Sequence, residues 1–104
     1  MSVYMLYHSK AKPEHRDRLE KIDEIRTKFE EIYRKYEVNI VGFWESAEDP
    51  TETYYLSKYE NEDDYKRKVE LLRSDERYVQ LTKELDEIRL DTKATRLTPK
   101  WIPE

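Results

Sequence analysis

The fold of this chain is decided by the stretch Val38–Glu60, which reads VNIVGFWESAEDPTETYYLSKYE. Two runs rich in Val, Ile, Phe, Trp and Tyr flank the polar segment Ala47–Glu52, which contains a proline and three acidic residues. Apolar runs of β-branched and aromatic residues, separated by Pro and acidic residues, are typical of two strands joined by a turn. The stretch therefore predicts a β-hairpin, and the helices on either side are expected to pack on it.

Both strands of this hairpin are apolar at both sets of alternating positions. In the first strand, Val38, Ile40 and Trp44 are expected on one face, and Val41 and Phe43 on the other. In the second strand, Tyr55 and Tyr59 are expected on one face, and Tyr54 and Leu56 on the other. A strand that is apolar on both sides is buried on both sides. The helices can cover one face, and too few elements remain to cover the other. We therefore expect a homodimer in which a second copy of the sheet covers the open face.

The chain before the hairpin predicts one strand and one long helix. Residues 2–8 alternate two apolar sets and predict a first strand, and residues 9–12 are expected to form a short connection. Apolar residues spaced three and four apart predict a helix from Pro13 to about Tyr36. Proline suits the first helical position because its missing N–H would be unpaired there.

The chain after the hairpin predicts further helix and a last strand. Asn61 is expected to cap a helix that runs to about Arg73, and Ser74 to cap a continuation that begins at Asp75. Whether the segment up to Ile88 is one helix or two stays open at this point. The extended, β-branched pattern from about residue 90 predicts a final strand.

The predicted order of elements is β-α-β-β-α-β, with the second helical part single or divided. This order is the ferredoxin-like arrangement of the α+β class, an antiparallel sheet with helices on one face. At 104 residues the chain is expected to be a single domain, 1–104, able to bury a core.

Charge and composition exclude several classes of function. The chain has 24 acidic and 20 basic residues, a net charge of −4 and no Cys. A nucleic-acid binder is expected to be basic, so we expect no nucleic-acid partner. No apolar run approaches the roughly 20 residues that span a bilayer, and no signal-peptide core is present, so we expect a cytoplasmic protein without a membrane partner. One Gly and abundant Glu, Lys and Arg resemble the composition of thermophilic proteins.

The basic run Lys66–Lys68 does not alter that expectation. Each of its residues follows an acidic residue by four positions, in Glu62–Asp64, which favours ion pairs along one solvated helix face. The single glycine of the chain also excludes a glycine-rich phosphate loop. No cofactor is therefore expected.

The only two histidines could meet near the start of the first helix. His8 ends the predicted first strand, and His15 lies in the first turn of the helix that follows. With Glu14 they could form a weak metal or acid–base site. The alternative, two solvated or singly bonded imidazoles, is favoured because two ligands do not make a metal site and no HExxH spacing exists.

Aromatic side chains offer a second candidate site, between the sheet and the helices. Six residues could line a pocket there: Tyr4, Trp44, Tyr54, Tyr55, Tyr59 and Tyr65. Such a pocket would bind a flat hydrophobic ligand, which phenolic hydroxyls could orient. The alternative is that these residues form an aromatic core and a dimer interface.

Three short motifs resemble the NIPSNAP family of dimeric α+β barrel proteins. They are VGFW at 41–44, YLSKYE at 55–60 and SDERY at 74–78. In the family a VGxW strand precedes a strand ending in LWxYxS/N, and a DPxW stretch follows the second helix. The chain departs at Ser57, where the family often has Trp, at Glu76, where it has Pro, and in a hairpin turn without Gly. The resemblance implies a dimeric α+β barrel, and the departures imply a different pocket lining.

Two functions of different classes follow. The first is a non-catalytic or small hydrophobic ligand-binding module. The second, suggested by the wider superfamily, is a cofactor-independent monooxygenase or isomerase acting on a hydrophobic aromatic substrate in the sheet–helix cleft, although fold alone does not establish activity. An enzyme needs a polar group of perturbed pKa that faces a cavity. The candidates are His8, Tyr4 and Tyr55.

Overall fold

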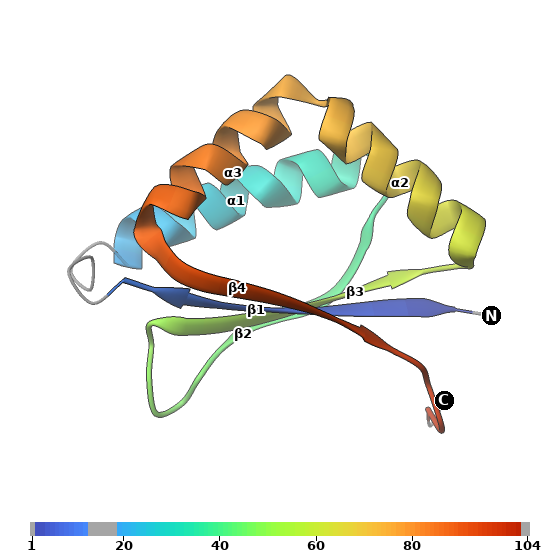
Figure 1. Cartoon of the computed structure of the whole chain (residues 1–104), viewed down its shortest axis with the longest axis horizontal. Coiled ribbons are helices and arrows are strands. Elements are labelled where there is room, and N and C mark those ends of the chain that lie inside the picture. Colours follow the sequence, from blue (N-terminus) through green and yellow to red (C-terminus); the bar gives the residue numbers. More distant parts are fainter. Residues whose placement is uncertain (1, 13–18, 103–104) are drawn as a thin grey trace.

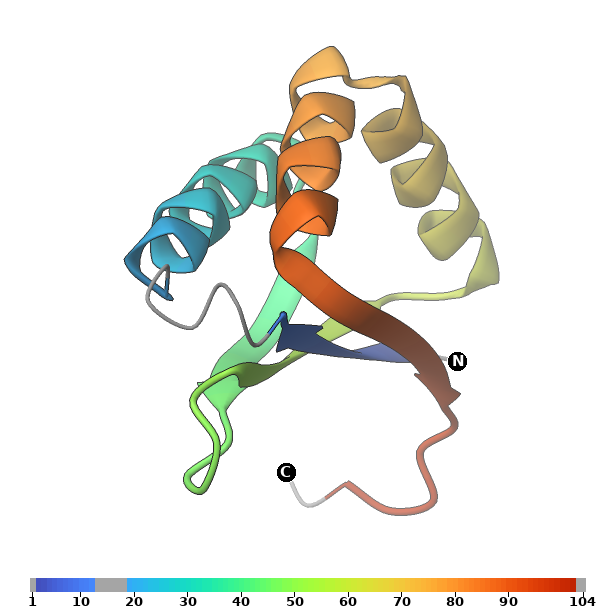
Figure 2. The same ribbon diagram turned by 60° about the vertical axis from the view of Figure 1, so that its left-hand side comes forward.

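The structure is a computed structural model that describes residues 2–12 and 19–102. In chain order the described elements are β1 (Val3–Ala11), α1 (Leu19–Lys35), β2 (Asn39–Glu45), β3 (Glu52–Tyr59), α2 (Glu62–Ser74), α3 (Glu76–Ile88) and β4 (Arg89–Leu97). The strands form one antiparallel sheet in the order β2-β3-β1-β4. Figure 1 shows the helices together over one face of the sheet, and Figure 2 shows the other face without a helix. The predicted ferredoxin-like βαββαβ fold is confirmed.

The first strand is longer than its apolar pattern indicated. It continues past His8 to Ala11, so the connection predicted over residues 9–12 was wrong. Ser9 and Lys10 remain in the sheet because β1 is a central strand, and each pairs with residues of both β3 and β4. Backbone hydrogen bonds to the strands on both sides keep these polar residues in the sheet, although their side-chain pattern alone predicts a loop.

A bulge in β2 changes the face assignment of the first hairpin strand. The register with β3 shifts between Ile40 and Gly42, which leaves Val41 as an extra residue. A bulge inverts the alternation that follows it. Ile40 therefore packs against the core and Phe43 lies on the same, helix-covered side, whereas Trp44 pairs with Tyr54 on the other side. The expectation that Ile40 and Trp44 share a face was wrong for this reason.

The helical part after the hairpin consists of two helices that meet at Asp75. The side chain of Asn61 accepts the N–H of Asp64 at 2.8 Å, which confirms the predicted cap of α2. At the junction, Asp75 has extended backbone angles, and its carboxylate accepts the N–H of Tyr78 at 3.0 Å. Asp75, rather than Ser74 as predicted, therefore caps α3, and Ser74 is the last residue of α2.

The first helix is followed from Leu19 onward, and its predicted start at Pro13 lies outside the described residues. Beyond its end, Glu37 takes a positive φ of 56°, and its carbonyl accepts a bond from the Lys68 ammonium at 2.7 Å. Lys68 is only 8% exposed and also lies 3.3 Å from the Asp64 carboxylate. The expectation of a fully solvated basic face over 66–68 was therefore wrong at Lys68, which ties α2 to the end of α1.

The core lies between the helices and the covered face of the sheet. On the sheet, Val3 pairs with Tyr59 and Met5 with Ser57, so these side chains point toward the helices. Buried helix residues pack over them: Ile25, Ile32, Leu72, Leu81 and Ile88. Burying a side chain of this size contributes about 1.5–3 kcal/mol. Among the described residues no helix is long and apolar enough to cross a lipid bilayer.

The opposite face of the sheet is open to solvent in the single chain and carries a row of apolar and aromatic side chains. These are Tyr4, Leu6, Trp44, Tyr54, Leu56 and Leu97, and His8, Lys58, Lys93 and Thr95 lie among them. Trp44 is 51% exposed and Leu97 39%. This open face is the surface for which the sequence predicts a second cover.

Candidate functional site

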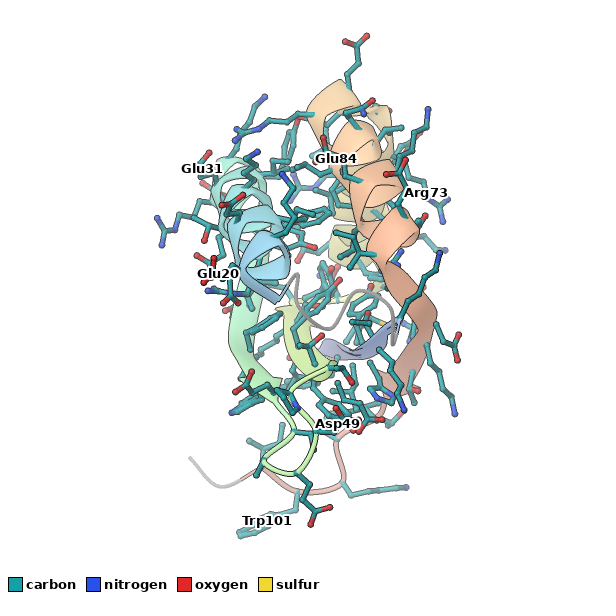
Figure 3. The ribbon with its side chains drawn as sticks, turned by 90° about the vertical axis from the view of Figure 1, so that its left-hand side faces the viewer. Glu20, Glu31, Asp49, Arg73, Glu84 and Trp101 are labelled. Carbon is teal, nitrogen blue, oxygen red and sulfur yellow. The ribbon has the colours of Figure 1, made fainter. Side chains whose placement is uncertain are left out.

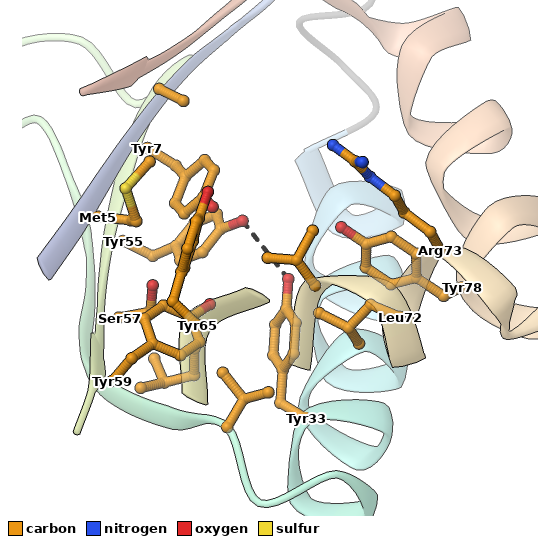
Figure 4. Close-up of a pocket in the computed structure, with 14 residues that line it drawn as sticks. Met5, Tyr7, Tyr33, Tyr55, Ser57, Tyr59, Tyr65, Leu72, Arg73 and Tyr78 are labelled. Carbon is orange, nitrogen blue, oxygen red and sulfur yellow. Dashed lines mark hydrogen bonds between the residues drawn. The ribbon is translucent and has the colours of Figure 1, made fainter. Parts of the chain in front are cut away.

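A cavity of about 300 Å³ lies between the sheet and the helices. Side chains from all four strands and all three helices reach its wall, and Figure 4 shows the aromatic rings that surround it. Six of the lining residues are tyrosines: Tyr7, Tyr33, Tyr55, Tyr59, Tyr65 and Tyr78. We call this space the tyrosine cavity.

The tyrosine cavity adjoins a second cavity of about 190 Å³ with which it shares four tyrosines. Two arginines lie on the wall of the second cavity. Arg26 donates to Glu30 at 2.6 Å and stacks over the Phe43 ring, 5.0 Å from its centre. Arg89 donates to Asp86 at 2.6 Å. Carboxylates therefore neutralise the charges on this side.

The tyrosine rings hold one another in place. Tyr7 and Tyr55 stack with ring centres 4.5 Å apart, and Tyr59 meets Tyr65 edge-on at 5.0 Å. The Tyr33 and Tyr55 hydroxyls lie 3.4 Å apart in a long hydrogen bond. Aromatic pairs in stacked or edge-on contact stabilise each other by about 0.5–1.5 kcal/mol beyond the area that they bury.

Burial raises the pKa of the Tyr7, Tyr33 and Tyr55 phenols above the ordinary tyrosine range. It also raises the pKa of Tyr59 and Tyr78, and the charges of nearby arginines partly counter the rise at Tyr78. All five phenols are therefore neutral at physiological pH. They can donate a hydrogen bond to a ligand, but they cannot take up its proton.

Two other polar side chains face the tyrosine cavity from opposite walls. Ser57 lies on β3 and is 1% exposed, and its hydroxyl forms no hydrogen bond with the described residues. The same hydroxyl lies close enough to Tyr59 to lower the pKa of that phenol, which partly counters the rise caused by burial. Arg73, from the last turn of α2, is the one charged residue in the described lining. Figure 4 shows its guanidinium group beside Tyr78.

The structure divides the six predicted pocket residues between the two faces of the sheet. Three line the tyrosine cavity: Tyr55, Tyr59 and Tyr65. The other three lie on the open face, outside the space between sheet and helices: Tyr4, Trp44 and Tyr54. Neighbouring residues of a strand point in opposite directions, so one cavity cannot hold both Tyr54 and Tyr55. Ligand binding by these residues stays a prediction.

Three tyrosines of the cavity were missed by the sequence analysis: Tyr7, Tyr33 and Tyr78. Each carried a usable signal. Tyr7 shares its strand face with Val3 and Met5, and the other two lie on the apolar faces of their helices. Apolar periodicity predicts a core position for each of them, and it does not distinguish a packed ring from one that borders a cavity.

The predicted catalytic candidates are not brought together. Tyr55 lies in the cavity, whereas Tyr4 and His8 lie on the open face. His8 stacks on Tyr54 with ring centres 4.5 Å apart, and its Nε2 atom is 3.6 Å from a Glu52 carboxylate oxygen. His15 lies outside the described residues. Among those described, no cluster of three His, Cys, Asp or Glu side chains could hold a metal ion.

A four-stranded antiparallel sheet with helices on one face and an apolar second face defines the subunit fold of the dimeric α+β barrel class. Comparison with solved structures agrees. The chain superposes on a NIPSNAP family protein from Agrobacterium tumefaciens with a TM-score of 0.79 at 15% identity, covering 96% of this chain and 94% of that one. An uncharacterised NIPSNAP domain protein from Burkholderia xenovorans gives 0.80 at 15% identity, with 100% of both chains covered.

The same fold occurs in an enzyme. A cofactor-independent oxygenase from Streptomyces nogalater superposes with a TM-score of 0.78 at 8% identity, covering 99% of this chain and 98% of that one. No protein-family model and no curated protein sequence matches the chain. Similarity at these identities establishes the shared fold, and it confirms the NIPSNAP resemblance at that level.

Proposed function

We propose that this protein is a homodimeric module that binds a small, hydrophobic, aromatic ligand in the tyrosine cavity. The observation that carries the proposal is the cavity itself, about 300 Å³ in volume and walled by six tyrosine rings. Pockets for small molecules begin at roughly this volume and combine apolar walls with a few polar groups. Aromatic faces stack on a flat ligand, and neutral hydroxyls can orient it.

The lining favours binding over catalysis. A cofactor-independent oxygenation or an isomerisation begins with removal of a substrate proton by a base. The described residues that line the tyrosine cavity include no carboxylate and no imidazole. Its buried phenols are neutral, because burial raises the pKa of Tyr55 and its neighbours. We therefore propose ligand binding ahead of an oxygenase or isomerase function.

The open face supports the dimer. Its exposed apolar side chains include Trp44 on β2 and Leu97 on β4, at the two edges of the sheet. Exposed large apolar side chains that gather on one face favour an interaction site there. Trp101, which follows β4, is 81% exposed and extends on the same side of the sheet, away from the helices (Figure 3). Packing the open faces of two copies together would cover these residues.

Calorimetric titration with naphthol tests the binding function. The wild-type protein should bind naphthol with a measurable heat and a raised melting temperature. Ala94 lines the tyrosine cavity from β4, so Ala94→Leu should reduce its volume and weaken binding at least about tenfold. Ala47→Leu, the same change in the exposed hairpin turn, is the matched control and should bind like the wild type. No binding by the wild type, or equal binding by Ala94→Leu, would contradict the proposal.

A further inference from the structure

We infer that the ligand of the tyrosine cavity is an aromatic acid, whose carboxylate is held by Arg73 while its ring lies among the tyrosines. This inference rests on the proposed function and specifies its ligand class. It follows from the charge of the cavity wall and from the position of the buried Ser57 hydroxyl.

Arg73 differs from the other arginines at the two cavities. Arg26 bonds the carboxylate of Glu30 at 2.6 Å, and Arg89 bonds that of Asp86 at the same distance. Arg73 is an exposed residue, and no described carboxylate pairs with it, in a chain where acidic residues outnumber basic ones by 24 to 20. The C-terminal end of α2 favours a cation, but that preference is met by any basic residue and does not require one at a cavity.

A guanidinium group is suited to the proposed partner. Its planar donors match the two oxygens of a carboxylate and form short, charge-assisted bonds. Arg73 stands beside Tyr78, whose hydroxyl is neutral because burial raises its pKa. A neutral phenol next to the arginine leaves its positive charge available and adds a possible donor for the same anion.

The opposite wall determines the orientation of the ligand. The Ser57 hydroxyl is buried and forms no hydrogen bond with the described residues. No charged residue lies at that wall, and a carboxylate buried there would have no counter-charge, which is costly. A neutral polar atom on the ring can reach Ser57, whereas the acidic group belongs at Arg73 on the exposed side of the cavity.

Paired probes test the inference. Naphthoic acid and naphthamide have nearly the same shape, and only the acid is charged at neutral pH. In low-salt calorimetry, the wild type should bind the acid about tenfold more tightly than the amide, the value of one charge-assisted hydrogen bond. Arg73→Gln should abolish this preference, and Arg73→Lys should keep part of it. Lys66→Gln, the same charge change at an exposed site of α2, is the matched control and should leave the preference intact.

The outcomes separate this inference from the proposed function. Equal affinities for acid and amide in the wild type, or a preference that survives Arg73→Gln, would overturn the aromatic-acid ligand while leaving the binding module in place. Failure of naphthol, acid and amide alike to bind the wild type would overturn the proposed function itself. A melting curve of each variant establishes that the compared proteins are folded, and Arg73→Lys supplies the comparison should Arg73→Gln not fold.

Discussion

The indole ring of Trp44 lies directly over Gly42, two residues before it on β2. A β carbon built on Gly42 would lie 2.6 Å from two carbon atoms of that ring, closer than any real contact. Gly42 is the only glycine of the chain, and both residues belong to the open face. The glycine therefore leaves room for a large aromatic ring close to the backbone of β2, on the open face that the proposed dimer would cover.

Gly42→Ala should weaken the proposed dimer about tenfold, because the new methyl group lifts the indole away from the sheet, at a cost of about 1.4 kcal/mol. The stability of the monomer should change by less than about 1 kcal/mol, since Trp44 is half exposed and can move. Sedimentation velocity over a dilution series measures the dissociation constant. In a Trp44→Leu background, Gly42→Ala should change the dissociation constant of the dimer little further. An unchanged dissociation constant for Gly42→Ala alone would contradict a role of Gly42 in placing the indole.

Lys68→Met should lower the free energy of unfolding by about 2 kcal/mol, as expected when one partner of a buried, hydrogen-bonded charge is removed. The methionine keeps the apolar stem but loses the bond to the Glu37 carbonyl and the contact with Asp64. Lys66→Met is the matched control on the exposed side of α2 and should stay within about 0.5 kcal/mol of wild type. Equal urea midpoints for the two variants would contradict a stabilising role of the buried Lys68 ammonium.

Stability should fall in acid as two aspartates are protonated. The Glu60 N–H and Lys68 lower the pKa of Asp64, and the Tyr36 hydroxyl and the Tyr78 N–H lower that of Asp75. A carboxyl whose folded pKa lies below its unfolded value stabilises the fold above the unfolded value and loses this contribution as pH falls through the folded one. Urea denaturation should therefore show constant stability down to about pH 5 and a decline below about pH 4.

A comparison with Asp64→Asn checks the cause of that decline. This variant should be less stable than wild type at neutral pH, and its stability should fall less steeply in acid, because one of the two titrating groups is gone. If the acid limbs of the two proteins are parallel, Asp64 does not contribute to the decline.

The buried tyrosines should behave in the opposite way in alkali. Burial raises the pKa of Tyr7, Tyr33 and Tyr55, so their neutral state stabilises the fold below the unfolded pKa, and that contribution is lost as pH rises through the folded pKa. In a spectrophotometric titration, their tyrosinate absorbance should appear only when circular dichroism reports unfolding. Full ionisation of all nine tyrosines in the folded protein would contradict this burial.

The sequence predicted the order of elements well because its information is local. Apolar alternation located the strands, and Asn61 marked the start of α2. The cap at Asp75 was misplaced by one residue because Ser74 beside it is an equally good capping type. Such one-residue choices depend on the backbone angles at the junction, which side-chain type alone does not determine.

The site was harder to predict because it depends on which face of each strand meets the helices. Tyr54 and Tyr55 are the same residue type, and only the pairing of Tyr55 with Tyr7 across β1 and β3 assigns one to the cavity and the other to the open face. The bulge at Val41 then reverses the alternation for the rest of β2. Both facts belong to the register of the sheet, which the pattern within one strand cannot supply.

Native mass spectrometry of the protein purified from its own source tests the dimer and the bound aromatic ligand in one experiment, because it reports the number of subunits and any retained ligand together. A chain that is apolar on both faces of its sheet should appear at twice its mass of 12.8 kDa, with a small aromatic molecule bound to each subunit. A bare monomer of 12.8 kDa at high micromolar concentration would show that the open face needs no second copy, and it would contradict the proposed homodimer.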